Sequence, residues 1–470
     1  MKNILLSLSL LLAATLGGCI EDSFSTAPAD APVAAVDTLR MGTVFTEECT
    51  PTFRFTLHNR ASKSVSISSI SLSGADAAHF RINVDGFSGK EFHDVEIRNR
   101  DSIFIFVEAT LPANGRTTPV PADARVEYSC NGVTRSVVLQ AMGRDACRLR
   151  AHTVTGTLDT DPARPYIVYD SLVVAPGATL NILPGTEMYF HDGAHMAVRG
   201  TLRAAGTPDA WIHLAGDRTG NVVADISFDI MSRQWTGIFF TAGSHGNLMQ
   251  NVDMRNTWQG LAINGDPAAG LSPDLRLINC RLHNSAGLVL EATHATTEIL
   301  GTELAEGGEG LLYLQGGEHT VNHCTLANYY LFSAIGGAAL QLAHTGIDGD
   351  DDGSGAPHTS LLMTNSIIYG LGDDLNHKDL SGSQITLQSC LLKSAGTDDA
   401  NFISCLWDTD PLYCNDRSAY VFDYRLQPDS PALGAADASL TLPDAATDCL
   451  GHPRGTSPAL GAYALPGELR

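Results

Sequence analysis

Short runs that alternate apolar and polar positions mark the first part of the chain. In "FRFTL", for example, Phe53, Phe55 and Leu57 share one face. Alternation with a period of two is typical of strands that are buried on one side and solvated on the other. Polar turns separate the runs, which predicts a small β-sandwich domain over residues 37–146. The runs cover residues 53–57, 65–72, 80–84, 103–109, 125–130 and 136–141.

A second pattern begins near residue 165, where strand-like runs follow one another and end at Gly, Pro or Asp. Six segments of eight residues can be superposed, and we call them the six repeat segments. Their first and sixth positions are apolar throughout, and their fourth position is small or Val. The segments are "MQNVDMRN" (249–256), "LINCRLHN" (277–284), "ILGTELAE" (299–306), "VNHCTLAN" (321–328), "MTNSIIYG" (363–370) and "LQSCLLKS" (387–394).

The spacing of the repeat segments predicts a solenoid. Successive fourth positions are 28, 22, 22, 42 and 24 residues apart, from Val252 to Cys390. A period of 22 to 28 residues is too short for two packed helices and suits one turn of a parallel β-helix with about three strands. Stacked turns place like residues in ladders, so we expect Cys280, Cys324 and Cys390 to be compact buried residues of one ladder.

The step of 42 residues contains an insertion near residues 344–360, "HTGIDGDDDGSGAPHTS". Asp348, Asp350 and Asp352 alternate before a glycine, and Ser354 can add a backbone carbonyl, as in calcium-binding loops. The twelfth loop position is Thr359, where such loops have a bidentate Glu. The segment is therefore interpreted as a calcium site or, alternatively, as a solvated acidic loop.

The charge of the chain limits its partners. With 29 Lys and Arg against 52 Asp and Glu, the formal charge is −23. Repulsion from nucleic acid excludes it as a partner, and the same field disfavours acidic polysaccharides unless a cation or a local basic patch intervenes.

The N-terminus, "MKNILLSLSLLLAATLGGCIEDS", has one basic residue, a short apolar run and small residues before Cys19. This pattern is typical of an export signal. Its "LGGC" ending resembles a bacterial lipobox, which implies a signal peptide over residues 1–18 and acylation of Cys19; an ordinary secretory peptide is the alternative. Residues 19–36 are rich in Ala, Pro, Ser and Asp and predict a flexible tether. The resemblance implies an outer-membrane lipoprotein of the cell envelope, anchored in the lipid membrane and displayed at the cell surface.

Nine cysteines follow Cys19. Because export leads to an oxidising compartment, disulfides are permitted, although an odd number leaves one thiol unpaired within the chain. Cys49 and Cys130 each border a predicted sandwich strand, and we expect them to form a disulfide; two free small residues are the alternative.

The phrases "PGATLNILPGTEMYF", "WTGIFF" and "DYRLQPDSPALGAAD" resemble right-handed parallel β-helix proteins of the pectin-lyase-like superfamily, especially lipid-anchored bacterial surface members. The resemblance covers residues 150–465. The segments "TLHNRASKSVSISSISLSG" and "DSIFIFVEATLPANG" resemble immunoglobulin-like modules of the hydin type. The resemblances imply an all-β chain with a right-handed parallel β-helix, a solenoid, preceded by an immunoglobulin-like β-sandwich.

The superfamily contains both enzymes and binding proteins, and fold alone does not decide between them. The ionisable candidates, among them Arg276, Arg281 and Glu303, are scattered in the sequence, and no catalytic residue is identified from it. We therefore expect a non-catalytic β-helix that binds an extracellular polysaccharide or a surface protein. The alternative is a polysaccharide lyase or glycoside hydrolase, which needs at least two convergent ionisable residues in a lateral groove.

The calcium hypothesis predicts that calcium soaked into crystals is bound by Asp348, Asp350 and Asp352. Electron density for calcium between the three carboxylates is the expected result, because alternate carboxylates of a tight loop converge on one ion. Absence of that density contradicts the metal site.

Overall fold

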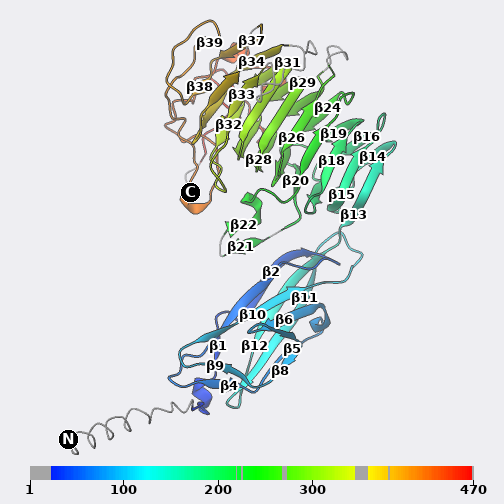
Figure 1. Cartoon of the computed structure of the whole chain (residues 1–470), viewed down its shortest axis with the longest axis vertical. Helices are drawn as coiled ribbons and strands as arrows, with labels where there is room; N and C mark the ends of the chain where they lie inside the picture. The colour runs from blue at the N-terminus through cyan, green and yellow to red at the C-terminus, as the bar shows by residue number, and fades with distance from the viewer. Residues whose placement is uncertain are drawn as a thin grey trace, which may run out of the picture. The chain divides into compact units, whose positions relative to one another are not determined.

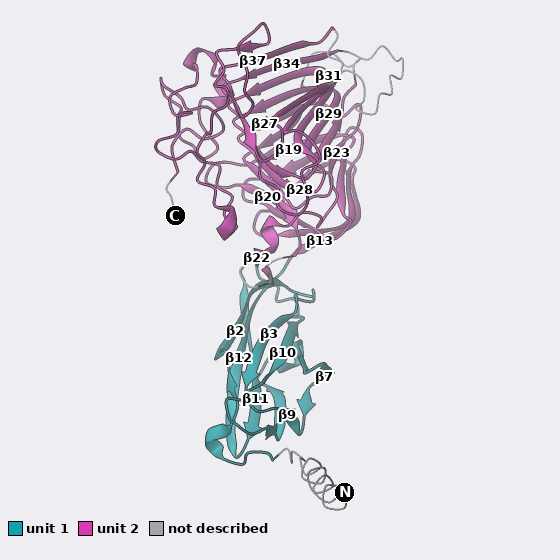
Figure 2. Cartoon of the chain, turned by 60° about the vertical axis from the view of Figure 1, so that its left-hand side comes forward, with its two compact units in different colours: residues 1–145 teal, residues 146–470 magenta. Residues whose placement is uncertain are grey.

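The computed structural model describes residues 23–218, 220–223, 226–266, 273–343, 358–378 and 382–467. Within these ranges the chain forms strands and short 3₁₀ turns and no α-helix. It divides into two compact units, Met1–Asp145 and Ala146–Arg470 (Figure 2). No helix in the described ranges is long and apolar enough to cross a membrane. The all-β class predicted from the sequence is confirmed.

Unit 1 is a sandwich of two five-stranded sheets. Alternating side chains of both sheets, such as Leu57, Ile70 and Ile105, are fully buried between them. Its strands pair in antiparallel fashion, except β2 and β12, which are parallel. One sheet has the order β1 (Val33–Ala34), β3 (Phe53–His58), β10 (Ser102–Ala109), β6 (Phe80–Val84), β7 (Phe87–Gly89), and the other β2 (Thr38–Phe45), β12 (Val133–Arg144), β11 (Val120–Cys130), β5 (Ser69–Ser73), β8 (Glu91–Phe92); β4 (Val65–Ile67) pairs with β9 (Val95–Ile97).

The predicted disulfide between Cys49 and Cys130 is wrong, because both thiols are free. Cys49 is exposed beside the end of β10, where the backbone N–H of Thr50 donates a hydrogen bond to the carbonyl of Ala109. Cys130 ends β11, which returns from β10 along the sandwich, and its buried thiol donates to the carbonyl of Ser66. The two cysteines therefore lie at opposite ends of the sandwich, beyond the reach of a disulfide.

Unit 2 is a parallel β-helix with a sheet of 25 strands, whose successive turns stack in Figure 1. The paired strands of this sheet are parallel to one another, so the predicted β-helix is confirmed. The strands are β13 (Cys147–Val154), β14 (Thr157–Asp159), β15 (Tyr166–Val174), β16 (Thr179–Ile182), β17 (Glu187–Phe190), β18 (His195–Val198), β19 (Thr201–Ala205), β20 (Ile212–Gly216), β23 (Gly237–Phe240), β24 (Asn247–Gln250), β25 (Val252–Arg255), β26 (Leu261–Asn264), β27 (Leu275–Ile278), β28 (Arg281–Ser285), β29 (Leu288–Leu300), β30 (Glu303–Gly307), β31 (Gly310–Asn322), β32 (Thr325–Asn328), β33 (Leu340–Ala343), β34 (Thr359–Thr364), β35 (Ile367–Gly370), β36 (Leu375–Lys378), β37 (Gln384–Gln388), β38 (Leu391–Leu392) and β39 (Phe402–Ile403). A separate hairpin joins β21 (Asn221–Val223) and β22 (Ile226–Ser227).

The six repeat segments are stacked in the predicted register. The first-position ladder pairs Met249 with Leu277, Leu277 with Ile299, and so on to Leu387. The sixth-position ladder runs in the same way from Met254 to Leu392. Cys280, Cys324 and Cys390 are fully buried at the fourth position, as predicted. Burial raises the pKa of the Cys280 and Cys324 thiols to about 12, so neither is a nucleophile at neutral pH.

The position of the insertion follows from the strand register. In one turn, Gln315 and Gly317 are separated by a single residue; in the next turn their partners, Ala343 and Thr359, are separated by residues 344–358. The extra residues thus enter between two strands whose pairing is undisturbed. Asp348, Asp350, Asp352 and Ser354 lie outside the described residues, so the calcium site stays a prediction.

The C-terminal segment, residues 404–467, covers the outer face of several turns. Outward-facing Ala305, Ala327 and Ile367 are fully buried beneath it. They form a second apolar cluster with side chains of the segment: Tyr413, Tyr424, Leu426, Ala432, Cys449, Ala459, Leu460, Ala462 and Tyr463. The β-helix therefore packs on both sides of the strands β30, β32 and β35.

Replacing Leu304, a fully buried residue of the sixth-position ladder, with Ala is expected to lower the free energy of unfolding by about 2–5 kcal/mol, because the stacked neighbours cannot close the cavity. Urea denaturation of unit 2 measures the change. Glu309→Ala, at an exposed position in the same turn, is the control and should change stability by less than about 0.5 kcal/mol. Equal effects of the two substitutions would contradict the ladder.

Candidate functional site

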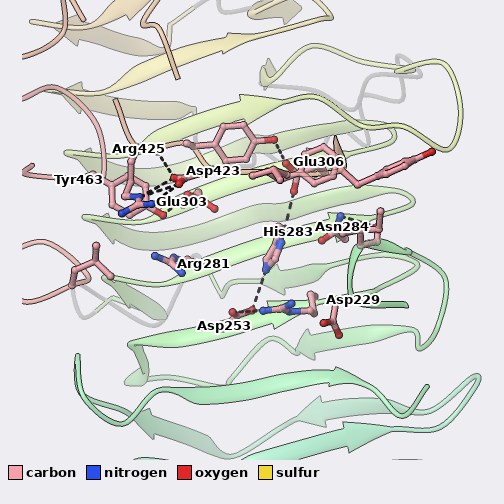
Figure 3. A pocket seen from close by; sticks show the side chains of 17 residues that line it. Asp229, Asp253, Arg281, His283, Asn284, Glu303, Glu306, Asp423, Arg425 and Tyr463 are labelled. Carbon is pink, nitrogen blue, oxygen red and sulfur yellow. Dashed lines mark hydrogen bonds and ion pairs between the residues drawn. The ribbon is translucent and has the colours of Figure 1, made fainter. Parts of the chain in front are cut away.

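A pocket of about 390 Å³ lies between the outer face of β25, β28 and β30 and the C-terminal segment (Figure 3). Nine of its lining residues carry an ionisable group on the side chain if tyrosines are left aside. The lining consists of Asp229, Ile230, Asp253, Arg255, Arg281, His283, Asn284, Glu303, Glu306, Tyr420, Val421, Phe422, Asp423, Tyr424, Arg425, Leu450 and Tyr463. We call it the lateral pocket.

The register of the β-helix assembles the charged floor of this pocket. At the fifth position of the repeat segments, Arg281 pairs with Asp253 on one side and Glu303 on the other. At the seventh position, Arg255 pairs with His283. Stacked turns are about 4.8 Å apart, so residues 22 to 28 apart in the sequence meet in one small volume.

A chain of contacts crosses the pocket from Asp253 to Tyr424. His283 Nε2 lies 3.0 Å from Asp253 Oδ1, and His283 Nδ1 lies 3.7 Å from Glu306 Oε2 (Figure 3). The Tyr424 hydroxyl donates to Glu306 Oε1. Asp253 also accepts two hydrogen bonds from Arg255, at 3.1 and 2.5 Å.

Within this series of contacts, the pKa values of two carboxyl groups are shifted in opposite directions. Burial raises the pKa of Glu306 to about 8, and the nearby charge of Glu303 adds to the shift. Burial also raises the pKa of Asp253, but Arg255 and His283 outweigh it and hold that pKa well below its usual range. At neutral pH one carboxyl is therefore protonated and the other ionised, an arrangement typical of acid–base sites.

His283 lies between the two carboxyl groups. Its hydrogen bond to an ionised Asp253 requires a proton on Nε2. Its Nδ1 faces Glu306 Oε2, a buried oxygen without a hydrogen-bond partner among the described residues. The distance of 3.7 Å between these two atoms is too long for a hydrogen bond.

The backbone at Glu306 is unusual for its residue type. The eighth position of three consecutive repeat segments has a positive φ, 71° at Asn256, 57° at Asn284 and 48° at Glu306. Asn tolerates this left-handed conformation, whereas Glu adopts it at a cost. Glu306 therefore combines an unfavourable backbone conformation with a buried carboxyl, and such combinations concentrate at functional sites.

Glu303 and Arg281 form the other end of the pocket. The Tyr463 hydroxyl donates to Glu303 Oε2 at 2.5 Å. The Arg281 guanidinium lies over the rings of Trp211 and Tyr463, with centroid distances of 5.0 and 5.5 Å. Burial lowers the pKa of Arg281, but Tyr463 and Glu303 outweigh it and raise this pKa overall. Arg281 therefore stays charged.

The lateral pocket contains residues that the sequence analysis did not bring together. Arg281 and Glu303 were noted as isolated candidates, whereas Asp253, His283 and Glu306 were missed. All five lie in the repeat segments, at their fifth, seventh and eighth positions. Reading these outward positions as ladders, like the inward ones, is the signal that identifies them.

Two predictions from the sequence, lipidation and calcium binding, concern residues that the structure does not describe. Cys19 and the aspartates of the insertion lie outside the described residues. Among the residues that the structure describes, no group of three or more His, Cys, Asp or Glu side chains is arranged to hold a metal ion.

The raised pKa of Glu306 predicts a pH dependence of stability. Its carboxyl binds a proton up to about pH 8 in the folded chain, but only up to about pH 4.3 when unfolded. The folded state thus holds the extra proton between these values, and stability falls as pH rises through this window. Glu306→Gln should remove that loss, which amounts to at most about 1.4 kcal/mol per pH unit. Denaturation at pH 5, 6, 7 and 8 measures both slopes; parallel slopes for the two proteins would contradict a raised pKa.

Comparisons with known proteins add one distant likeness. No protein family model matches the chain, and no curated protein sequence matches it. Among solved structures, it is similar to a family 123 glycoside hydrolase from Clostridium perfringens, whose structural analysis concerns glycolipid glycan hydrolysis. The match has 8% identity and a TM-score of 0.19, and it covers 27% of each chain. The chain thus matches about a quarter of that enzyme, and a likeness at this level does not bear on fold or activity.

Proposed function

We propose that this chain is a glycoside hydrolase of the cell envelope, with the lateral pocket as its active site. The observation that carries the proposal is the convergence of Asp253 with Glu303 and Glu306, which lie two turns further along the β-helix, and Glu306 is protonated at neutral pH. Convergent ionisable residues in a lateral groove are what the enzymatic alternative requires and what a flat binding surface lacks.

Glu306 is proposed as the general acid. Hydrolysis of a glycosidic bond needs a proton on the departing oxygen and a second carboxyl group that assists the attack at the anomeric carbon. Glu306 carries the proton, and Glu303, in the same strand, is proposed as the second carboxyl group. Asp253 and His283 are proposed to position Glu306 and to hold its proton on the side of the pocket.

The composition of the pocket favours hydrolysis over elimination. A lyase needs a Lys or Arg that accepts a proton from the sugar. The described lining contains no lysine, and the pKa values of Arg255, Arg281 and Arg425 are all raised, because nearby acidic groups outweigh burial. The three arginines therefore hold their protons and are poor bases.

The rim supplies groups that suit a sugar. Tyr420, which is 43% exposed, and the half-buried Phe422 come from the C-terminal segment and line the pocket. Aromatic rings pack against the apolar face of a sugar ring, and the charged floor bonds to its hydroxyls. The volume of about 390 Å³ lies at the small end of the range for small-molecule sites, which suits the terminal unit of a glycan.

Acylation of Cys19 is proposed to anchor the chain in the outer membrane, with the sandwich as an immunoglobulin-like stalk and the right-handed β-helix facing extracellular polysaccharide. Calcium binding by the insertion is a separate proposal.

Binding without catalysis is the second candidate. Tyr424 and Tyr463 each donate a hydrogen bond to one of the two glutamates. In this case the buried charges fix the C-terminal segment on the β-helix, and glycan or a surface protein binds elsewhere.

Glu306→Gln is expected to lower kcat by about 10²–10⁴-fold, because Gln cannot donate the proton to the leaving oxygen. Release of reducing ends from a panel of neutral and acidic polysaccharides measures the activity. In the native chain, activity should also fall as pH rises through about 8. Glu309→Gln, which changes an exposed glutamate three residues away, should leave the rate unchanged.

No release from any polysaccharide, by a chain whose thermal unfolding is normal, would favour the binding function. Unsaturated products instead of reducing ends would contradict hydrolysis and favour a lyase.

A further inference from the structure

Unit 1 has a groove of its own, unrelated to the lateral pocket. It measures about 720 Å³ and lies on the sheet β1-β3-β10-β6-β7, on the side turned away from the sandwich core. Its floor is Phe106, and most of its other lining residues are polar. The lining consists of Thr52, Arg81, Ile82, Asn83, Gly86, Ser88, Gly89, Lys90, Phe106 and Glu108.

Two aromatic rings lie side by side on this face. Phe104 and Phe106 are two residues apart on β10, so both point to the same side of the sheet, and their ring centroids are 6.0 Å apart. Phe104 is 42% exposed and Phe106 is half-buried. The inward-facing residues of the same strand, such as Ile105, are fully buried. The core therefore does not need the two phenylalanines, and their exposure calls for another explanation.

Polar groups are held in place around the Phe106 ring. The strand register puts Asn83 directly beside Phe106, on β6, and Ser88 beside Asn83, on β7. Asn83 Nδ2 donates to Ser88 Oγ at 3.2 Å. On the other side of the groove, Thr52 Oγ1 donates to Glu108 Oε1 at 2.7 Å, and Arg81 Nη2 lies 3.5 Å from Glu108 Oε2. Donors and acceptors thus alternate around one ring.

The hairpin beside the groove is rigid. Asp85 and Gly86 join β6 to β7 with φ values of 50° and 91°, and Asn83 Oδ1 accepts from the backbone N–H of Gly86. An Asp-Gly pair with two positive φ values is the preferred two-residue turn between twisted strands. The groove is therefore preformed, which lowers the entropic cost of binding.

We infer that this face of unit 1 is a carbohydrate-binding site that accepts a segment of a glycan chain. A sugar ring has an apolar face of C–H groups and a rim of hydroxyls that both donate and accept hydrogen bonds. The apolar face matches the ring of Phe106, which Phe104 extends. The hydroxyls match the polar side chains around that ring, which are Asn83, Ser88, Arg81 and Glu108.

The polar rim favours a glycan over a protein or a lipid surface. A docking face for protein has an apolar centre with few charges, whereas Arg81, Lys90 and Glu108 surround Phe106 here. An anionic membrane is disfavoured by the chain's formal charge of −23. The inference does not depend on hydrolysis in the lateral pocket, because the groove contains no group assigned to that reaction.

The full chain tests the inference by affinity electrophoresis in gels that contain galactomannan, xyloglucan, mixed-linkage β-glucan or hyaluronan. At least one polysaccharide should retard the native chain. Phe106→Thr should weaken that retardation at least tenfold in apparent affinity, because the sugar loses its aromatic platform. Thr has a high β-propensity, so the strand is retained, and Phe104→Thr should have a weaker effect of the same sign. Glu309→Gln, at an exposed position of unit 2, should bind as the native chain does.

Phe87→Thr is the matched control. Phe87 is 74% exposed in the neighbouring strand and pairs with Val84, so it lies on the side of the sheet opposite to Asn83 and Ser88. It should not change binding. Lack of retardation by every polysaccharide, or equal retardation of the native chain and a folded Phe106→Thr variant, would overturn the inference.

Discussion

The in-register stacking of parallel turns is the constraint on which the rest of unit 2 depends. Each residue of a turn lies about 4.8 Å from its counterpart in the next, because the backbones bond to each other. Inward positions must then carry side chains that pack against the same position of the next turn. The small buried side chains of the fourth-position ladder, Val252, Cys280 and Thr302, meet this requirement. The same constraint acts on outward positions, where charges of one sign would repel. Asp253, Arg281 and Glu303 alternate in sign along their ladder.

Alternating charges alone would be an ordinary solvated face. The C-terminal segment changes their energetics, since Tyr424 and Tyr463 bring apolar rings and hydroxyls onto the glutamates. Burial makes an isolated charge expensive. Asp253 remains ionised because Arg255 and His283 compensate for its burial. At Glu306, burial and the charge of Glu303 outweigh Tyr424 and Arg255, so this carboxyl holds a proton. The chemistry of the lateral pocket thus results from two parts of the chain that are more than a hundred residues apart.

The two proposed glycan sites rely on different kinds of interaction. In the lateral pocket, buried carboxyl groups with opposite protonation states are suited to bond cleavage. In unit 1, a preformed hairpin, the exposed Phe104 and the half-buried Phe106 are suited to holding a glycan chain without changing it. A surface enzyme with a separate binding module keeps a polymer near its active site, because the second contact forms at a high effective concentration.

Periodicity in the sequence was enough to predict the β-sandwich strands, the β-helix, its ladders and the place of the insertion. These features repeat locally, with periods of two residues and of one turn, so no distant contact is needed to recognise them. The predicted disulfide failed because the border of a strand does not say at which end of a sandwich a cysteine lies. The lateral pocket was missed for a related reason. Asp253, His283 and Glu306 were visible in the repeat segments, but only burial beneath the C-terminal segment, which has no repeat of its own, turns them from surface charges into an acid–base site.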